Sequence, residues 1–526
     1  MLSEIESQWR PSARYFQQFG SGNPALSLSV QCWCSRGKGV GEMLLNALLC
    51  TVLLCFCHAY DYDTYFYKQK VDHFSFADPD SFTQRYLIND EFWDSNGGPI
   101  FFYAGNEGDI TLFVDNTGFM WDIAPEFNAM VVFAEHRYYG VSMPYGNESF
   151  SEPKYTGYLT SEQALADYVE LITYLKTAIS GAEKSPVITF GGSYGGMLAA
   201  WFRMKYPHIV QGAIAASAPI LQFIDITPCE NFGQLVTTDF ATESKECAEV
   251  IRRSWAAIDS VTSDDAGKTW LTNAWSLCEP LKTQEDIKAL KDYLVNVWTN
   301  LAMIDYPYPA NFLAPLPAFP IKVVCSHLTN PEQVPTALLQ ELFEGLSVYF
   351  NYTGEAKCLD SNQQADVRLD DKGWDFQACT EMVMPFCYDG INDFFEPAPW
   401  DFKAFAEDCY NKWGVYPRPF MVAHMYGGKD ISAASNIVFS NGLLDPWSTG
   451  GVLWNVSDTV VSVIIPEGAH HLDLRGSNPG DPQSVIDARI TEKAYIKTWI
   501  DDYTYKHNKS KHDKDELHER FQNKIP

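Results

Sequence analysis

Three residues far apart in the chain carry the side chains that nucleophilic catalysis needs. Ser193 lies in the motif G-G-S-Y-G, Asp445 lies in the turn N-G-L-L-D-P-W, and His470 is the first histidine of G-A-H-H-L. A serine hydroxyl becomes a good nucleophile only when an adjacent base takes its proton, and a carboxylate orients that base. The chain order serine, aspartate, histidine is one of the known orders for such a triad. These three residues are therefore the predicted catalytic triad.

The elements around Ser193 suit a nucleophile on a sharp turn. The apolar run 186–190 precedes the motif and predicts a strand, and the run 197–205 after it predicts a helix. Glycines on both sides permit the strained strand-to-helix turn, and the helix N-terminus stabilises negative charge. We expect the backbone N–H groups of Tyr194 and Asn106, the latter in the G-N-E-G loop, to form an oxyanion hole.

The rest of the pattern predicts a parallel sheet with helices on both faces. Leu165, Tyr168, Ile172, Leu175 and Ile179 recur at helical spacing within 160–179, and Thr160 with Gln163 has a capping-box pattern. Short apolar runs that predict buried strands lie on either side of this helix and again near the end of the chain. They are 99–103, 129–134, 186–190, 212–216, 436–440 and 459–465. Strands that alternate with helices are typical of a parallel sheet.

This pattern is interrupted for about 200 residues between its two halves. The interruption has helical character, for example at 335–350, and we interpret it as an inserted cap over the active edge of the sheet. The predicted division is a leader at 1–59, core segments at 60–218 and 426–502, the cap at 219–425, and a charged mobile tail at 503–526.

The leader contains a predicted signal peptide. The apolar run 43–57 has 15 residues and follows Arg36 and Lys38, whereas a membrane-spanning helix needs about 20 apolar residues. Translation could start at Met1 or Met43, and the sequence leaves this open. We expect a protein that enters the secretory pathway and has no membrane span after cleavage of the signal.

Eight of the 13 cysteines lie after the leader, all of them within the predicted cap. None has the spacing of a zinc site, and an oxidising compartment favours four disulfides, so we expect no metal and no cofactor. Four N-x-S/T sequons predict glycosylation, at Asn147, Asn351, Asn455 and Asn508.

Composition excludes several other classes of protein. With 526 residues, of which 46% are hydrophobic and 20% charged, the chain can bury a large core and is not disordered. The net charge of −29 would repel a phosphate backbone, so nucleic acid is excluded as the expected partner. The oligomeric state stays open, with a homodimer as one option.

Several long blocks of sequence carry a family resemblance. They are F-F-Y-A-G-N-E-G-D-I from Phe101, F-A-E-H-R-Y-Y-G from Phe133, G-G-S-Y-G-G-M-L-A-A-W-F-R-M-K-Y-P-H from Gly191, F-S-N-G-L-L-D-P-W from Phe439 and E-G-A-H-H-L-D-L-R from Glu467. From about Tyr65 to Ile500, the chain resembles the serine peptidase family of lysosomal Pro-Xaa carboxypeptidase. Dipeptidyl peptidase II shares most of these blocks. The blocks I-K-V-V-C from Ile321 and T-E-M-V-M-P-F-C from Thr380 resemble the carboxypeptidase more closely.

The resemblance implies an α/β-hydrolase core with a helical cap, and the triad named above with His470 rather than His471 as its base. It also implies cleavage of peptide substrates next to proline, in a lysosomal or secreted protein. It also implies four disulfides. The implied pairs are Cys229 with Cys387, Cys247 with Cys325, Cys278 with Cys358, and Cys379 with Cys409.

Two groups of residues are candidates for substrate recognition. Proline is a compact apolar body without an N–H, so we expect a hydrophobic pocket walled by Met197, Trp447 and Met384. A carboxypeptidase must also bind a free carboxylate, for which His471 and Arg475 are candidates.

Three functions stay open, and the first is preferred. The first is a carboxypeptidase that removes a residue after a penultimate proline. The second is a dipeptidyl peptidase that releases N-terminal Xaa-Pro. The third is a catalytically silent binding protein of the hydrolase fold.

Overall fold

The computed structural model describes residues 60–362, 369 and 371–522. The chain divides into two compact units, Met1–Ala59 and Tyr60–Pro526. The predicted leader, with its signal run at 43–57 and both candidate start residues, lies outside the described residues. All described elements belong to the second unit.

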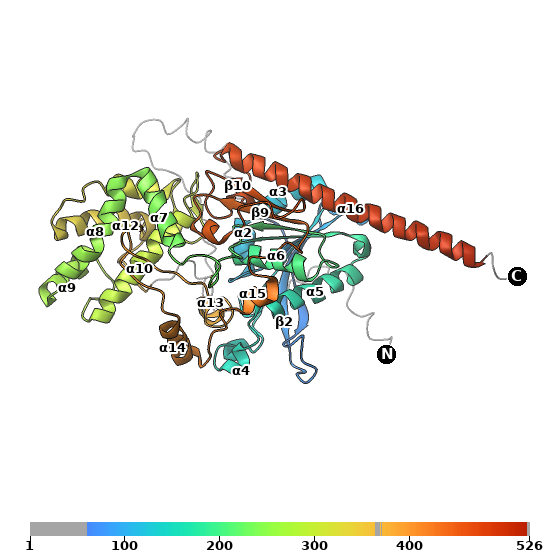
Figure 1. Cartoon of the computed structure of the whole chain (residues 1–526), viewed down its shortest axis with the longest axis horizontal. Coiled ribbons are helices and arrows are strands. Elements are labelled where there is room, and N and C mark those ends of the chain that lie inside the picture. The colour runs from blue at the N-terminus through green and yellow to red at the C-terminus, as the bar shows by residue number, and fades with distance from the viewer. Residues whose placement is uncertain (1–59, 363–368, 370, 523–526) are drawn as a thin grey trace, which may run out of the picture. The chain divides into compact units, whose positions relative to one another are not determined.

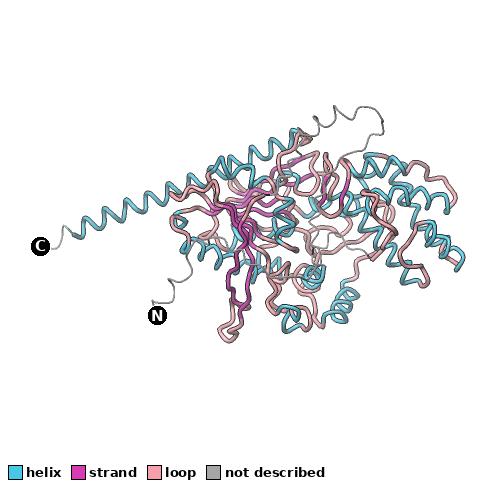
Figure 2. The backbone as a smooth tube through the Cα atoms, turned by 180° about the vertical axis from the view of Figure 1, so that it is seen from behind, coloured by secondary structure: helices cyan, strands magenta, loops and turns pink. Residues whose placement is uncertain are grey.

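An eight-stranded sheet forms the centre of the described unit (Figures 1 and 2). The strand order is β1-β2-β4-β3-β5-β6-β9-β10. The pairs β1–β2 and β2–β4 are antiparallel, and every pair from β4 to β10 is parallel. The strands are β1 (Asp63–Lys70), β2 (Ser81–Asn89), β3 (Ile100–Ala104), β4 (Met130–Ala134), β5 (Val187–Gly192), β6 (Gly212–Ala216), β9 (Ile437–Gly442) and β10 (Val460–Ile465).

The apolar runs of the sequence became the parallel strands because both faces of this sheet are buried. β3 shows the principle, since Phe101 belongs to one hydrophobic cluster and its neighbour Phe102 belongs to the other. Consecutive side chains of a strand point to opposite faces, so one run of apolar residues supplies both clusters. The two antiparallel strands β1 and β2 are largely polar and half exposed. Their sequences lack the buried-strand pattern, and the prediction did not include them.

Helices of the core cover the two faces of the sheet. Residues of α5 and α6 belong to one of these clusters, and residues of α2, α3 and α16 belong to the other. The helices are α2 (Ile110–Asn116), α3 (Phe119–Phe127), α4 (Pro153–Thr156), α5 (Ser161–Ala178), α6 (Tyr194–Lys205) and α16 (Gln483–Gln522), with 3-10 turns η1 (Gly146–Glu148), η2 (Ala182–Lys184), η3 (Pro446–Gly450) and η4 (Leu472–Leu474).

Of the capping box predicted at the start of α5, the structure has the Thr160 half and lacks the Gln163 half. Thr160 accepts a hydrogen bond from the N–H of Gln163 (3.2 Å), as a helix cap does. The side chain of Gln163 does not complete a capping box, because it accepts from the N–H of His73 (2.9 Å) and donates to Asp72 (2.7 Å). A tertiary contact has taken the place of the local one.

A long, mainly helical segment connects β6 to β9, and Figures 1 and 2 show its helices α7 to α12 gathered to one side of the sheet. Its elements are α7 (Asn231–Glu243), α8 (Lys245–Val261), α9 (Asp265–Ala274), α10 (Gln284–Met303), β7 (Ala310–Asn311), β8 (Pro315–Leu316), α11 (Pro320–His327), α12 (Pro335–Phe350), α13 (Asp371–Ala378), α14 (Phe402–Trp413) and α15 (Met421–Tyr426). We call this segment the cap. The predicted fold class, an α/β-hydrolase core with an inserted helical cap, is confirmed.

Four disulfides tie the cap, and each joins a pair that the resemblance implies. They are Cys229–Cys387, Cys247–Cys325, Cys278–Cys358 and Cys379–Cys409, with separations of 158, 78, 80 and 30 residues along the chain. In the chain-entropy description, loops of this length restrict the unfolded chain by roughly 3 to 5 kcal/mol each. The bridges therefore favour a folded cap.

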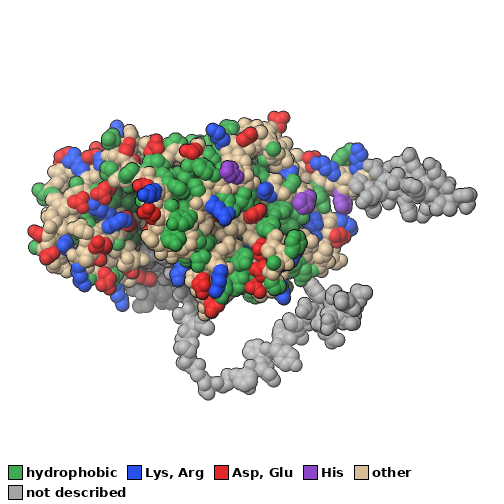
Figure 3. Space-filling model, turned by 60° about the horizontal axis from the view of Figure 1, so that its bottom comes forward, with side chains coloured by type: hydrophobic (Ala, Val, Ile, Leu, Met, Phe, Trp, Pro, Cys, Tyr) green, Lys and Arg blue, Asp and Glu red, His purple; other side chains and the backbone are tan. Residues whose placement is uncertain are grey.

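The last helix extends well beyond its predicted core at 486–500. α16 continues to Gln522, so most of the segment predicted as a tail has helical backbone. Its mobility stays a prediction. Among the described residues, no helix combines the length and the apolar character that crossing a membrane requires. On the face drawn in Figure 3, acidic side chains are interspersed with basic and apolar ones.

Candidate active site

Ser193 occupies the turn between β5 and α6. Its backbone has φ 60° and ψ −129°, a strained conformation for a residue with a side chain. A Cβ atom at Gly191 would lie 2.0 Å from the carbonyl oxygen of Gly195, and one at Gly195 would lie 2.9 Å from that of Ala104. The glycines of the motif thus allow the end of β5, the start of α6 and the end of β3 to approach one another. Ser193 is partly exposed at the end of the strand.

Asp445 and His470 meet at the ends of β9 and β10. The His470 Nδ1 atom lies 2.8 Å from Oδ2 of Asp445, and both side chains are buried. The other carboxylate oxygen of Asp445 accepts a hydrogen bond from the N–H of Trp447 (3.1 Å), which holds the carboxylate at the start of η3. With Nδ1 donating to the carboxylate, the Nε2 lone pair is left to accept a proton. This pair can therefore act as an oriented general base.

The cap holds the backbone of His470 on both sides. The N–H of His470 donates to the carbonyl of Met303 (3.0 Å), the last residue of α10. The hydroxyl of Tyr306 donates to the carbonyl of His470 (3.0 Å). Met303 and Tyr306 had no signal in the sequence, because their role depends on a contact across more than 160 residues.

The loop after β3 lies beside the Ser193 turn. A Cβ atom at Gly195 would be 3.0 Å from Oδ1 of Asn106, and the same oxygen accepts a hydrogen bond from the hydroxyl of Tyr103 (3.1 Å). Tyr194 is the first residue of α6, so its N–H has no partner within the helix. Both residues predicted for the oxyanion hole therefore lie at the Ser193 turn, Tyr194 within the motif and Asn106 beside it.

Ser193 opens into a cavity of about 710 Å³ between the core and the cap. Met197, Trp447 and Met384, the three residues predicted to bind proline, all contribute to its lining. Two aromatic rings not predicted for this role also line it. Phe232 and Phe386 lie with their ring centroids 5.0 and 5.7 Å from that of Trp447. The cavity therefore has an aromatic and thioether wall beside the nucleophile.

The two predicted carboxylate-binding residues do not line this cavity. The N–H of His471 donates to the Ser217 hydroxyl (2.7 Å), and burial lowers the pKa of this imidazole well below its ordinary value. The guanidinium of Arg475 lies over the Tyr306 ring, 4.6 Å from its centroid, and donates to Asn116 (3.1 Å). Packing against the cap has thus drawn Arg475 away from the position that the prediction gave it.

A buried polar network supports Tyr194. His136 Nδ1 faces the carbonyl of Arg137 (2.7 Å), so it carries a proton, and Nε2 accepts from the Tyr194 hydroxyl (3.1 Å). Burial lowers the pKa of His136 to about 4, which keeps this imidazole neutral. Gln377, at the end of α13, also donates to the Tyr194 hydroxyl (2.9 Å). A residue of the cap thereby touches the side chain that follows the nucleophile.

Glu381 extends this network from the cap to α5. It accepts from the N–H of Ser161 (2.6 Å) and from its hydroxyl (2.9 Å). The Ser161 hydroxyl is also 3.0 Å from that of Tyr426. Burial raises the pKa of Glu381 to about 7. The contact between cap and core therefore contains a carboxyl group that prefers its neutral form.

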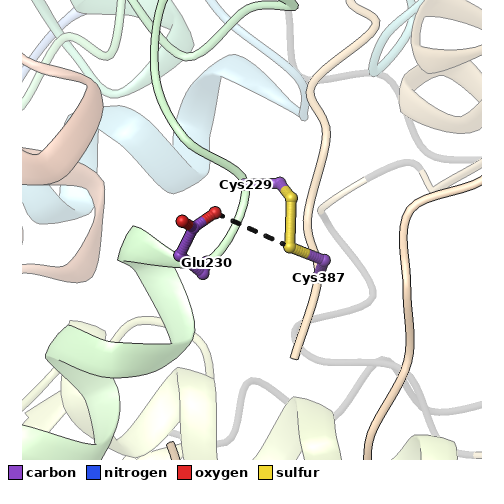
Figure 4. A group of neighbouring side chains, drawn as sticks. All are labelled: Cys229, Glu230 and Cys387. Atoms are coloured by element: carbon purple, nitrogen blue, oxygen red, sulfur yellow. Dashed lines mark hydrogen bonds between the residues drawn. A yellow bond between two sulfur atoms is a disulfide. The ribbon is translucent and has the colours of Figure 1, made fainter. Parts of the chain in front are cut away.

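Among the residues that the structure describes, one group of cysteine and acidic side chains lies close enough to suggest a metal site (Figure 4). It comprises Cys229, Glu230 and Cys387. The two sulfur atoms form a disulfide, so neither is a thiolate that could bind a metal ion. This group carries no metal chemistry.

The sequons lie outside the site. Asn147 and Asn455 are exposed and Asn351 is partly exposed, while the side chain of Asn508 is outside the described residues. Asn351 and Asn455 use their carbonyl oxygens to accept backbone hydrogen bonds, which leaves their amide nitrogens available.

Comparison with known proteins identifies the family of this chain. Residues 69–492 match the family described as serine carboxypeptidase S28. The human protein named lysosomal Pro-X carboxypeptidase is 56% identical over 445 residues, which cover 85% of this chain and 90% of the human protein. Prolyl carboxy peptidase like protein 5 of Caenorhabditis elegans is 43% identical over 466 residues, which cover 84% of this chain and 90% of the nematode protein. This chain therefore belongs to the serine carboxypeptidase S28 family.

Proposed function

We propose that this chain is a serine exopeptidase that removes the C-terminal residue after a penultimate proline, through an acyl-enzyme. The observation that carries the proposal is the oriented pair His470–Asp445, with its 2.8 Å contact, in a chain whose Ser193 turn opens into an apolar cavity. Relatives that share more than half of the aligned residues are named for this activity.

The proposed reaction uses the three side chains of the predicted triad. His470 Nε2 takes the proton of the Ser193 hydroxyl as its oxygen attacks the carbonyl carbon of the prolyl residue. The N–H groups of Tyr194 and Asn106 stabilise the oxyanion. His470 then gives its proton to the leaving amine, which frees the C-terminal residue. Water, activated by the same imidazole, hydrolyses the acyl-enzyme and restores Ser193.

Proline selectivity is assigned to the wall next to Ser193. The pyrrolidine ring has no N–H to satisfy, so Met197, Trp447 and Met384 can enclose it without leaving a polar group unpaired. The rings of Phe232 and Phe386 support Trp447 from the side of the cap.

The proposal includes entry into the secretory pathway and a lysosomal or secreted location. The predicted signal run 43–57, the four disulfides and the sequons at Asn147, Asn351, Asn455 and Asn508 support it. The domain division with a cap at 219–425 belongs to the same proposal, since β6 ends at Ala216 and β9 begins at Ile437.

The direction of cleavage is tested with a pair of peptides that end in Pro-Phe, one with a free and one with an amidated C-terminus. We expect release of phenylalanine from the free acid, which mass spectrometry of the products detects, and no release by Ser193→Ala. A third substrate, an Xaa-Pro fluorogenic amide with a free N-terminus, tests the dipeptidyl peptidase alternative.

Two results would contradict the proposal. Rapid hydrolysis of the Xaa-Pro amide, stopped by acetylation of its amine, would identify a dipeptidyl peptidase. Failure of Ser193 to react with a fluorophosphonate probe would identify a catalytically silent protein.

A further inference from the structure

One carboxyl group in the cavity has no role in the mechanism above. Glu107 follows Asn106 in the loop after β3, and it lines the cavity together with Ser193 and Tyr194. Its Oε2 atom is buried and has no hydrogen-bond partner among the described residues. A buried polar atom without a partner costs free energy, so its persistence beside a nucleophile points to a ligand that supplies the partner.

The neighbouring acidic residues already have partners. Asp109, in the same loop, caps α2 by accepting from the N–H of Thr111 (2.9 Å) and lies 2.7 Å from Arg85. Asp292 is the other carboxylate among the described residues of the lining. It lies on α10, is more than half exposed, and pairs with Lys288 at 2.6 Å. Of these three, only Glu107 has a buried carboxyl oxygen without a hydrogen-bond partner among the described residues.

A substrate with a free C-terminus brings a carboxylate into this cavity. No lysine, arginine or histidine is among the described residues that line it, and Arg475 is held against Tyr306. A neutral hydrogen-bond donor is therefore the group left to bind the carboxylate. A protonated carboxyl is such a donor, and an O–H to carboxylate hydrogen bond is among the strong, charge-assisted kind.

Glu107 also lies within electrostatic range of the proposed base. It interacts with His470, the residue that gives a proton to the leaving amine in the proposed mechanism. Burial is the largest effect on Glu107 and raises its pKa above the ordinary value, while Asn106 and His470 oppose this shift. Tyr103, in β3, also interacts electrostatically with it. At acidic pH the group is available as a donor.

We propose that Glu107 is a specificity residue that, as a neutral carboxylic acid, donates its O–H to the free C-terminal carboxylate of the peptide. The proposal rests on the carboxypeptidase activity proposed above. When Glu107 loses its proton, two carboxylates face each other and binding of the free acid weakens. A peptide amide escapes this repulsion, because its NH₂ group can donate to the ionised Glu107.

The test is the pH dependence of KM, with the free-acid and the amidated Pro-Phe peptide compared between pH 4.5 and 8. A peptide without turnover is measured by its Ki as a competitive inhibitor. For the native enzyme, we expect the KM of the free acid to rise by up to about tenfold per pH unit above the Glu107 pKa. The KM or Ki of the amidated peptide should not rise with pH. The effect of His470 on kcat is common to both peptides.

Glu107→Gln is the informative variant, because its side-chain amide donates a hydrogen bond at every pH. We expect it to bind the free acid with a KM that no longer rises with pH. Asp292→Asn, which changes the other described carboxylate of the lining, is the matched control and should keep the native profile. Thermal unfolding and the rate of reaction with a fluorophosphonate report whether each variant keeps its fold and its nucleophile.

Three outcomes would overturn the inference. One is a native KM that changes equally with pH for both peptides, a result that does not depend on any variant. Another is an equal fall in kcat for both peptides in Glu107→Gln with an unchanged KM, which would make Glu107 a support for His470. The third is that Glu107→Gln no longer binds the Xaa-Pro fluorogenic amide with a free N-terminus. That result would assign Glu107 to recognition of the substrate's ammonium group. If the native enzyme releases no phenylalanine at any pH, the proposed function fails instead.

Discussion

At the scale of single residues, the two adjacent histidines have different surroundings. His470 contacts Asp445 through Nδ1, whereas the His471 ring packs against Phe312, with 5.5 Å between the ring centroids. A Cβ atom at Gly192 would lie 2.9 Å from the His471 ring, so this imidazole fills space behind the Ser193 turn. Only His470 combines a free nitrogen with an orienting carboxylate.

We therefore predict that His470→Ala lowers kcat/KM by roughly 10⁴-fold or more, as removal of a triad base does. His471→Ala should cost at least about 100-fold less, because it removes packing and no proton acceptor. The measurement is hydrolysis of the free-acid Pro-Phe peptide by both variants. The assignment of the base would be wrong if the two losses were reversed.

At the scale of elements, the cap completes the site as well as covering it. The end of α10 and the loop after it bind the His470 backbone from both sides, through Met303 and Tyr306. The position of the proposed general base thus depends on how the cap docks on the core. Gln377 and Glu381 make a second such connection, at Tyr194 and at the start of α5.

Tyr306→Phe tests this connection, because it removes the hydroxyl that donates to the His470 carbonyl and keeps the ring that stacks with Arg475. One such hydrogen bond is worth about 1 kcal/mol, so we expect kcat to fall about fivefold. Tyr308→Phe is the control, since Tyr308 also packs against Arg475 but makes no hydrogen bond to His470. An equal effect of both variants on kcat would show that the loss comes from packing alone.

At the scale of the whole molecule, buried carboxyl groups make stability depend on pH. Burial raises the pKa of Glu381 to about 7, that of Asp305 to about 7 and that of Asp239 to about 9. In the unfolded chain these groups ionise near their ordinary pKa, whereas the folded protein keeps them protonated. The free energy of unfolding therefore falls as pH rises between those two values. His136, with its pKa lowered to about 4, has the opposite effect between about pH 4 and 6.5.

Glu381→Gln isolates one of these contributions. Between pH 4.5 and about 7 the native protein should lose up to about 1.4 kcal/mol per pH unit through this group, and the variant should not. The melting temperature of the native protein should therefore fall more steeply over this range than that of the variant. If the plots of Tm against pH were parallel for the two proteins, a raised pKa at Glu381 would be ruled out.

The sequence by itself determined the features that depend on neighbouring residues. The G-x-S-x-G motif between a predicted strand and a predicted helix indicated the turn, because only glycine permits the close approaches around Ser193. The continuous apolar runs became the parallel strands β3 to β6 and β9, β10, because a strand buried on both faces needs apolar side chains at every position. Asp445 and His470 could be placed at the ends of two such strands for the same reason.

Only the tertiary structure decided what depends on contacts across the chain. Tyr306 donates a hydrogen bond to His470, 164 residues away in the chain. Arg475 stacks on Tyr306 of the cap, whereas the sequence predicted a position near the substrate. β1 and β2 form because β2 pairs with β4 at the edge of the sheet and β1 pairs with β2. Their half-polar sequences did not predict strands. The unpaired Oε2 atom of Glu107 is of the same kind, since only the folded structure shows that it is buried without a partner among the described residues. Local pattern specifies the elements, and packing between distant segments specifies which side chains face the cavity.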